Sequence, residues 1–224
     1  MADKRVVAVI VEGPSDESAI GGILKEYFSS DETWFVVAHG DITSRKGINP
    51  SNVVSKLKAL VDEVRVRYGY NWRDFVRIIH IADTDGSFTK DSVIKSNVES
   101  VLYYEDHMET ANVEEIENRN LNKAAVLFRL YSTAKINKVD YRIYFNSCNL
   151  EHVLYNALKN FTDDEKEEMS DEFAEKYEGR LQDFIAFISA PDIAVSGTYK
   201  ETWKYIEKDK NSLQRHTNMH LIFE

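Results

Sequence analysis

Cysteine, proline and glycine are scarce in this 224-residue chain, which contains one Cys, three Pro and nine Gly. This scarcity excludes collagen-like chains, low-complexity disorder and disulfide-stapled scaffolds. The lone Cys148 cannot form a disulfide within the chain, so it favours a reducing compartment. With 43% apolar residues, a chain of this length buries a core without a structural metal, and we expect one or two compact domains.

Long hydrophobic runs are also missing. The longest uninterrupted apolar stretch, Val6 to Val11, has six residues, whereas a helix that crosses a bilayer needs about 20. Asp3, Lys4 and Arg5 do not resemble the start of a signal peptide. We therefore expect a soluble, cytoplasmic protein with no membrane partner.

Basic residues are outnumbered, because 28 Lys and Arg stand against 38 Asp and Glu and give a net charge of −10. This balance argues against a nucleic-acid partner, since affinity for phosphate backbones comes largely from Lys and Arg. Two acidic runs, residues 99–117 and 163–178, each carry −7, however, and the rest of the chain carries +4. That remainder fits either a basic face or ordinary solvated charges on helices.

Four short runs rich in β-branched and aromatic residues have the pattern of β-strands: residues 6–11, 34–38, 76–82 and 141–145. The first run is apolar throughout, which is typical of a strand covered on both faces in a mainly parallel sheet. Helical spacing of apolar residues predicts helices at 16–28, 51–66 and 121–134. This alternation predicts an α/β, Rossmann-like fold with a mainly parallel sheet flanked by helices.

The predicted core spans residues 1–160 and includes a polar insertion near 88–120. After residue 160 the strand signals nearly vanish. Helices are predicted at 163–177, 181–188 and 198–207, followed by a short last strand at 218–223. We therefore expect residues 161–224 to form a helical C-terminal extension.

Acidic residues gather where the first and third predicted strands end, and ligands of open α/β sheets bind at the carboxyl ends of strands. Glu12 and Asp16 follow the first strand, and Asp83 and Asp85 follow the third. Residues two apart in an extended chain point to the same side, so Asp83 and Asp85 can face one point. Glu12 joins them if the two strands are neighbours.

Such a group of carboxylates needs a positive partner. Carboxylates ~5 Å apart repel each other by roughly 3 kcal/mol per pair at an effective dielectric constant of ~20. We expect a bound cation, and an all-oxygen site suits Mg²⁺ or Mn²⁺ better than zinc. The alternative is structural, because Asp residues also initiate turns and cap helices.

The sequence around these acids resembles a Toprim domain. Residues 9–17 read Val-Ile-Val-Glu-Gly-Pro-Ser-Asp-Glu before a helix, and residues 79–86 read Ile-His-Ile-Ala-Asp-Thr-Asp-Gly at a strand end. These runs are similar to the family's Glu motif and Asp-x-Asp motif. The position of Asp16, and of Glu151 at the start of a later helix, is more similar to OLD-type nucleases and related phage-defence Toprim proteins than to topoisomerases or primases. The resemblance covers about residues 5–160.

The resemblance implies a metal-dependent endonuclease, a hydrolase that cleaves phosphodiester bonds in DNA or in RNA, tRNA included, and that acts in antiviral defence. It implies two Mg²⁺ or Mn²⁺ ions, with Glu12 as a ligand or as the general acid/base. The implied metal ligands are Glu12, Asp16, Asp83, Asp85 and Glu151. Lys200, at a predicted helix start, is a candidate for stabilising the charged transition state, and an ordinary surface lysine is the alternative.

No P-loop motif occurs in the chain. The ATPase that OLD proteins fuse to their Toprim domain is therefore expected as a separate subunit, or it is absent. The resemblance also leaves a homodimer open.

Two other functions fit part of the sequence. Asp83-Thr84-Asp85-Gly86 also resembles the first motif of haloacid-dehalogenase-like phosphatases, in which the first Asp attacks phosphorus. Its place in the third strand, and the lack of a later strand that ends in an acidic pair, count against that function. The other alternative is a non-catalytic, Toprim-like binding subunit whose acidic stretches dock onto a partner protein.

Overall fold

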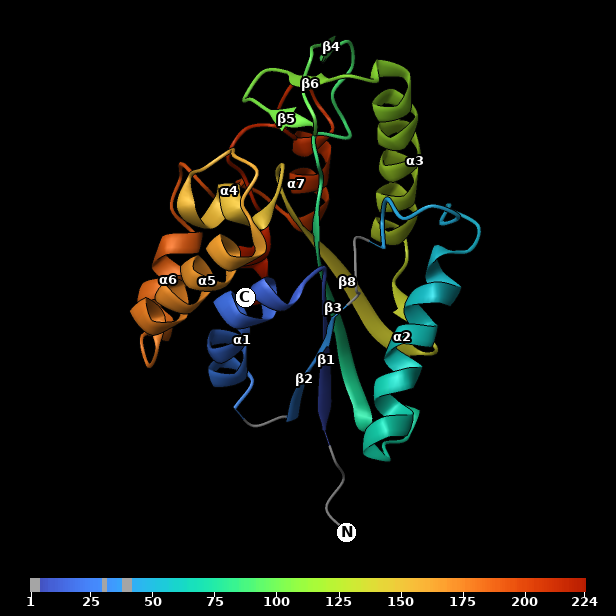
Figure 1. The fold of residues 1–224 in the computed structure, drawn as a ribbon. Helices are drawn as coiled ribbons and strands as arrows, with labels where there is room; N and C mark the ends of the chain where they lie inside the picture. The colour runs from blue at the N-terminus through green and yellow to red at the C-terminus, as the bar shows by residue number, and fades with distance from the viewer. Residues whose placement is uncertain (1–4, 30–31, 38–41) are drawn as a thin grey trace.

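The computed structural model describes residues 5–29, 32–37 and 42–224. Its main sheet has the strand order β2-β1-β3-β8-β7 (Figure 1). The strands are β1 (Val6–Val11), β2 (Glu32–Val37), β3 (Phe75–Asp83), β7 (Lys135–Ile136) and β8 (Val139–Asn146). Strand β1 pairs in parallel with β2 and with β3, and β3 pairs in parallel with β8. Strand β7 is antiparallel to β8. The α/β class is confirmed, with a mixed sheet.

Strand β1 lies at the centre of two hydrophobic layers. Val6, Ala8 and Ile10 face one layer, and the residues between them face the other. All six residues of β1 are buried. Because successive side chains of a strand point to opposite faces, an apolar run without alternation is what a doubly covered strand requires. The end of the predicted second strand, Ala38, lies outside the described residues.

Helices cover both faces of the sheet (Figure 1). Helices α1 (Pro14–Tyr27), α5 (Asp163–Tyr177) and α6 (Leu181–Ile188) pack on one face. Helices α2 (Val53–Tyr68), α3 (Val113–Tyr131) and α7 (Tyr199–Ile206) pack on the other. A short helix, α4 (Leu150–Tyr155), follows β8, and η1 (Trp72–Asp74) is a 3₁₀ turn before β3. No helix in the described residues is long and apolar enough to cross a membrane.

The predicted polar insertion contains structure of its own. Strands β4 (Val93–Lys95), β5 (Leu102–Tyr103) and β6 (Met108–Thr110) form a second sheet in the order β4-β6-β5. This small sheet lies beyond the carboxyl ends of the main strands (Figure 1). Helix α3 begins at Val113, earlier than predicted, because the Asn112 side chain accepts a hydrogen bond from the Glu115 N–H at 3.3 Å and caps the first turn.

The C-terminal segment packs against both faces of the main sheet. Its helices α5 and α6 have the predicted bounds, and Trp203 of α7 is buried against the opposite face. The predicted last strand at 218–223 is wrong, because Met219–Ile222 forms a 3₁₀ turn, η2. The described part of this segment therefore belongs to the same hydrophobic layers as the core.

Candidate functional site

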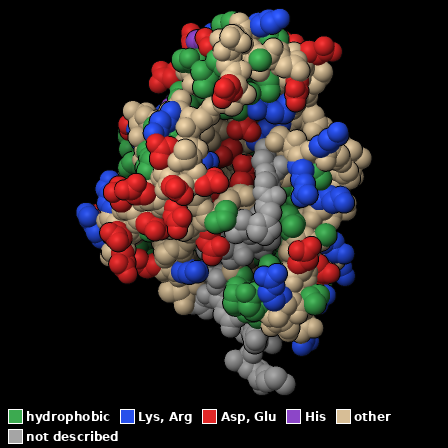
Figure 2. Space-filling model, in the orientation of Figure 1, with side chains coloured by type: hydrophobic (Ala, Val, Ile, Leu, Met, Phe, Trp, Pro, Cys, Tyr) green, Lys and Arg blue, Asp and Glu red, His purple; other side chains and the backbone are tan. Residues whose placement is uncertain are grey.

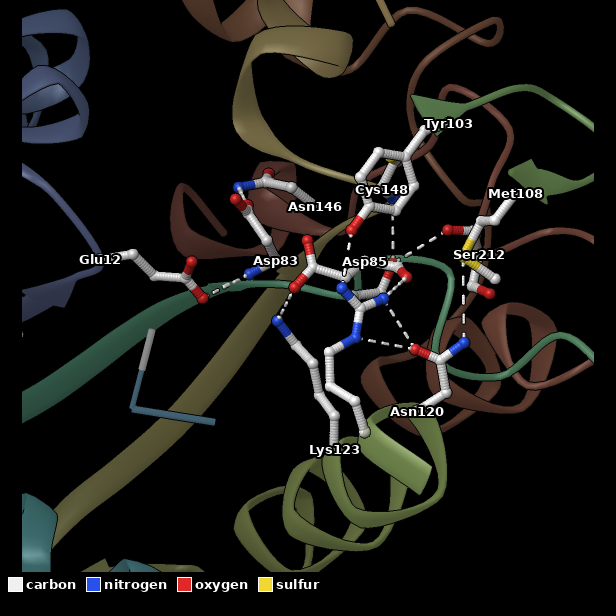
Figure 3. Close-up of polar contacts among 12 residues, drawn as sticks. Glu12, Asp83, Asp85, Tyr103, Met108, Asn120, Lys123, Asn146, Cys148 and Ser212 are labelled. Carbon is white, nitrogen blue, oxygen red and sulfur yellow. Dashed lines mark hydrogen bonds and ion pairs between the residues drawn. The ribbon is translucent and has the colours of Figure 1, made fainter. Parts of the chain in front are cut away.

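The carboxyl ends of β1 and β3 bring two of the predicted acids together (Figure 3). The strands are parallel neighbours, with Ile10 opposite His80. Glu12 directly follows β1, and Asp83 is the last residue of β3. The Asp83 N–H donates a hydrogen bond to Oε1 of Glu12 at 3.1 Å. The two residues are therefore linked through the Asp83 backbone, which leaves the Asp83 carboxylate to other partners.

Asp16 closes the loop between β1 and α1. Its Oδ2 accepts hydrogen bonds from the N–H groups of Glu12 at 3.1 Å and Gly13 at 3.0 Å. Burial, and next the negative charge of Glu151, raises the pKa of Asp16 to about 6. Asp16 thus has the helix-capping contacts of the structural alternative and also faces another acid.

The environment of Asp83 is more strongly perturbed than that of Asp16. Burial raises its pKa well above the usual value, and the charges of Asp16, Glu151 and Asp85 raise it further. Asn146, opposite Asp83 at the end of β8, donates a hydrogen bond from Nδ2 to Asp83 Oδ1 at 3.2 Å. A half-buried carboxylate whose charged form is destabilised by three other acids marks a place where positive charge is favoured. We call Glu12, Asp16, Asp83, Asp85 and Glu151 the acidic cluster.

Glu151 reaches the acidic cluster from α4. Asn149 caps this helix by accepting a hydrogen bond from the His152 N–H at 2.8 Å, which places Glu151 in the first turn. Its Oε1 lies 2.6 Å from Nζ of Lys166, on α5. The acidic helix α5 therefore contributes a cation to the cluster, and the Lys166 side chain keeps 37% of its surface exposed.

Asp85 is held by a second lysine. Its Oδ2 lies 2.5 Å from Nζ of Lys123, whose side chain is 0% exposed (Figure 3). Asp85 lies beyond β3, with a φ of 47°, so strand alternation does not set its direction as the sequence suggested. Its charge nevertheless acts on Asp83. The Asp85 carbonyl accepts a hydrogen bond from Arg119 Nη2 at 3.2 Å, and Arg119 also donates to the Tyr103 hydroxyl at 2.9 Å.

The site residues predicted from the sequence do not include Lys123, Arg119 or Asn146. One signal for Lys123 is present in the sequence. It lies four residues before Leu127 and seven before Leu130, both buried, so it occupies the apolar face of α3. A lysine on a buried helix face needs an acidic partner, and Asp85 supplies one.

Lys200 lies apart from these contacts. It is exposed in the first turn of α7. Within the described part of the chain, no hydrogen bond or ion pair joins Lys200 to the acidic cluster. Among the residues that the structure describes, Lys123 and Lys166 pair their ammonium groups with the cluster.

The donor atoms of the cluster suit a hard cation. They are carboxylate oxygens and the Asn146 amide, a set typical of Mg²⁺ or Mn²⁺ sites. Cys148 lies nearby, but burial, followed by the charges of Asp85 and Asp83, raises the pKa of its thiol well above the usual value. A protonated thiol disfavours soft metals. His80 is buried, and its Nδ1 is hydrogen-bonded to the Tyr141 hydroxyl at 2.9 Å, so it belongs to the core.

The described residues contain no three Asp, Glu, His or Cys side chains already arranged as a metal-binding group. The carboxylates instead face backbone N–H groups and ammonium groups. A cation would therefore replace some of these contacts as it binds.

Charge is unevenly distributed around this region. Figure 2 shows acidic side chains deep in a hollow near the centre of the face, with further acidic side chains over α5 to its left. Lys and Arg side chains lie to the right of the hollow (Figure 2). An acidic hollow beside basic side chains suits a cation together with an anionic substrate.

Comparison of the chain with protein-family models, with curated proteins and with solved structures finds no significant match in any of the three.

Proposed function

We propose that this chain is a divalent-metal-dependent nuclease of the Toprim type, which hydrolyses phosphodiester bonds in DNA or RNA. The observation that carries the proposal is the environment of Asp83, a half-buried carboxylate whose pKa is raised by desolvation and by three neighbouring acids. Two parallel strands and α4 converge on this point. Such a concentration of negative charge favours a bound cation of high charge.

The acidic cluster would hold Mg²⁺ or Mn²⁺ chiefly through Glu12, Asp16, Asp83 and Glu151. When bound, the metal supplies Lewis-acid polarisation of the scissile phosphate and of the attacking water. The oxygen of that water forms a new bond to phosphorus while the ester P–O bond breaks. In this proposal Glu12 accepts the proton of the water, and the leaving oxygen takes a proton from solvent.

Positive side chains would stabilise the extra charge of the transition state. Lys166 is better placed for this than Lys200, because its Nζ lies 2.6 Å from Oε1 of Glu151, whereas Lys200 is exposed and outside the described contacts of the cluster. In the cell, we propose that the chain acts in the cytoplasm in phage defence, as a homodimer or beside a separate ATPase subunit. This part of the proposal rests on the motif resemblance and on the lack of a P-loop in the sequence.

A cleavage assay on the full chain tests the proposal. Single-stranded DNA, duplex DNA and tRNA are each incubated with the wild-type chain and Mn²⁺, with EDTA as the metal-free control. We expect the wild-type chain to cleave in the presence of Mn²⁺ and not in EDTA. The cleavage rate of Glu12→Gln should be at least ~100-fold lower than that of the wild type. Glu168→Gln, an exposed substitution of the same chemistry on α5, should cut at the wild-type rate.

The same variants separate the alternatives. A phosphatase built around Asp83 would hydrolyse a small aryl phosphate, and Glu12→Gln would change that rate little. A binding subunit would cleave neither substrate, with or without Mn²⁺. Either result contradicts the nuclease proposal.

A further inference from the structure

The two lysines of the acidic cluster differ in how firmly they are held. Lys123 emerges from the middle of α3, and its side chain is 0% exposed. Lys166 lies on α5, and its side chain is 37% exposed. A partly exposed ammonium can move into water when a cation takes over its partner, whereas a fully buried one keeps its partner because separation leaves two uncompensated charges. Lys166 is therefore a displaceable counter-ion, and Lys123 is a fixed one.

The surroundings of Lys123 hold Asp85 in place as well. The Asp85 N–H donates a hydrogen bond to the Cys148 carbonyl at 2.8 Å, and its own carbonyl accepts from Arg119. The Asp85 carboxylate lies 2.5 Å from Nζ of Lys123. Charge-assisted contacts of this kind, made on a constrained loop, do not release a carboxylate readily. The Asp83 carboxylate instead accepts a neutral hydrogen bond from Asn146 Nδ2 at 3.2 Å.

We propose, on the basis of the nuclease function proposed above, that Lys123 takes the place of the second metal ion. The centre then binds a single Mg²⁺ or Mn²⁺ through Glu12, Asp16, Asp83 and Glu151, while Asp85 serves to hold the Lys123 ammonium rather than to bind metal. A fixed ammonium supplies one positive charge beside the reacting phosphate without a cation having to be captured from solution.

The number of bound ions tests this assignment. Calorimetric titration of the full chain with Mn²⁺ should give one ion per wild-type chain. Lys123→Ala removes the ammonium and frees Asp85, so we expect two ions per chain. Lys166→Ala is the matched control, because it removes an equal charge from Glu151 and should leave the stoichiometry at one, with equal or tighter affinity.

A charge-neutral double variant gives a second measurement that does not depend on the folding of Lys123→Ala. Asp85→Asn combined with Lys123→Met removes both members of the ion pair and leaves the net charge unchanged. If Asp85 does not bind metal, the Mn²⁺ affinity of this variant should stay within about threefold of the wild-type value. A loss of at least ~100-fold would show that Asp85 is a ligand and would overturn the assignment.

The remaining outcomes are also decisive. Two ions bound by the wild-type chain, or one bound by folded Lys123→Ala, would overturn the assignment and leave the nuclease proposal standing. Absence of Mn²⁺ binding in every variant would remove the metal centre itself, and the assignment with it. Paramagnetic resonance of bound Mn²⁺ distinguishes isolated from coupled ions and reports the same count independently.

Discussion

Glu12 and Asp83 lie 71 residues apart in the chain and are joined by a hydrogen bond from the Asp83 N–H to Glu12 Oε1 at 3.1 Å. The donor is a backbone group, so the contact depends on the pairing of β1 with β3 and not on the Asp83 side chain. The Asp83 carboxylate instead accepts from Asn146. Substitution of this carboxylate should therefore test metal binding without dismantling the strand ends.

For Asp83→Asn, we expect the Mn²⁺ affinity to fall by at least ~100-fold. The metal-free protein should be as stable as the wild type or more stable, because burial and neighbouring acids make the charged form of Asp83 unfavourable in the fold. Calorimetry with Mn²⁺ and thermal unfolding in EDTA measure the two effects. Asp171→Asn, at an exposed position of α5, should alter neither. Unchanged Mn²⁺ binding by Asp83→Asn would contradict the proposed centre.

The raised pKa of Asp16 predicts that the stability of the metal-free protein depends on pH. Its folded pKa of about 6 lies above the ordinary value of 3.8, so the folded chain binds this proton more tightly than the unfolded chain. The resulting stabilisation is complete below pH ~4 and is lost as the pH rises through ~6. Asp16→Asn removes this titration, and its amide oxygen can still accept the two backbone hydrogen bonds that Oδ2 accepts in the wild type. Relative to the wild type, the variant should gain about 1–3 kcal/mol between pH 4 and pH 7.

Urea unfolding in EDTA at pH 4 and pH 7 measures this change. The comparison uses the difference between wild type and variant at each pH, so that the other titrating groups cancel. A difference that does not vary with pH would show that the Asp16 carboxylate titrates normally in the fold.

The ion pair between Lys123 and Asp85 predicts a non-additive effect on stability. Lys123→Met should destabilise the chain by about 3–5 kcal/mol, because it leaves a carboxylate with 22% of its side chain exposed and no ammonium partner. Adding Asp85→Asn should recover more than half of this loss, since the uncompensated charge disappears. Denaturant unfolding of the wild type, both single variants and the double variant measures the coupling. Simple additivity would show that the pair is not an energetic unit.

The parts of the fold that the sequence predicts correctly are those in which local pattern and burial agree. Strand β1 is a continuous apolar run, and all of its residues are buried. Helices α5 and α6 have apolar residues at helical spacing, and their bounds match the prediction. Acidic residues at the ends of β1 and β3 are also visible in the sequence, because the carboxyl ends of parallel strands share one edge.

The prediction of a C-terminal strand is wrong because of tertiary contacts. Residues 218–223 contain four apolar residues, which suits a short strand. The Asn218 side chain, however, accepts a hydrogen bond from the Phe145 N–H of β8 at 2.8 Å. Its amide also donates to the Thr202 hydroxyl at 3.0 Å. These bonds join Asn218 to residues 73 and 16 positions away in the chain. A local sequence pattern does not record these long-range hydrogen bonds. They hold Asn218 in place, and the residues after it form the 3₁₀ turn η2.

Gly86, which follows Asp85, is expected to tolerate no side chain. Its φ is +66°, and an added Cβ would lie 2.5 Å from Cδ2 of the buried Leu213 and 3.3 Å from Cε of Met108. Gly86→Ala therefore combines left-handed backbone strain of about 1 kcal/mol with overpacking of about 1–3 kcal/mol. We expect a total destabilisation of about 2–4 kcal/mol in urea unfolding.

Gly69→Ala is the matched control for this substitution. Gly69 has a similar φ of +70° at the end of α2, but an added Cβ would meet nothing within 4 Å. It should therefore show the backbone strain alone, about 1 kcal/mol. The difference between the two variants isolates the contact with Leu213. Equal losses would mean that Leu213 moves aside without cost, and that the loop carrying Asp85 is less constrained by the C-terminal segment than its packing indicates.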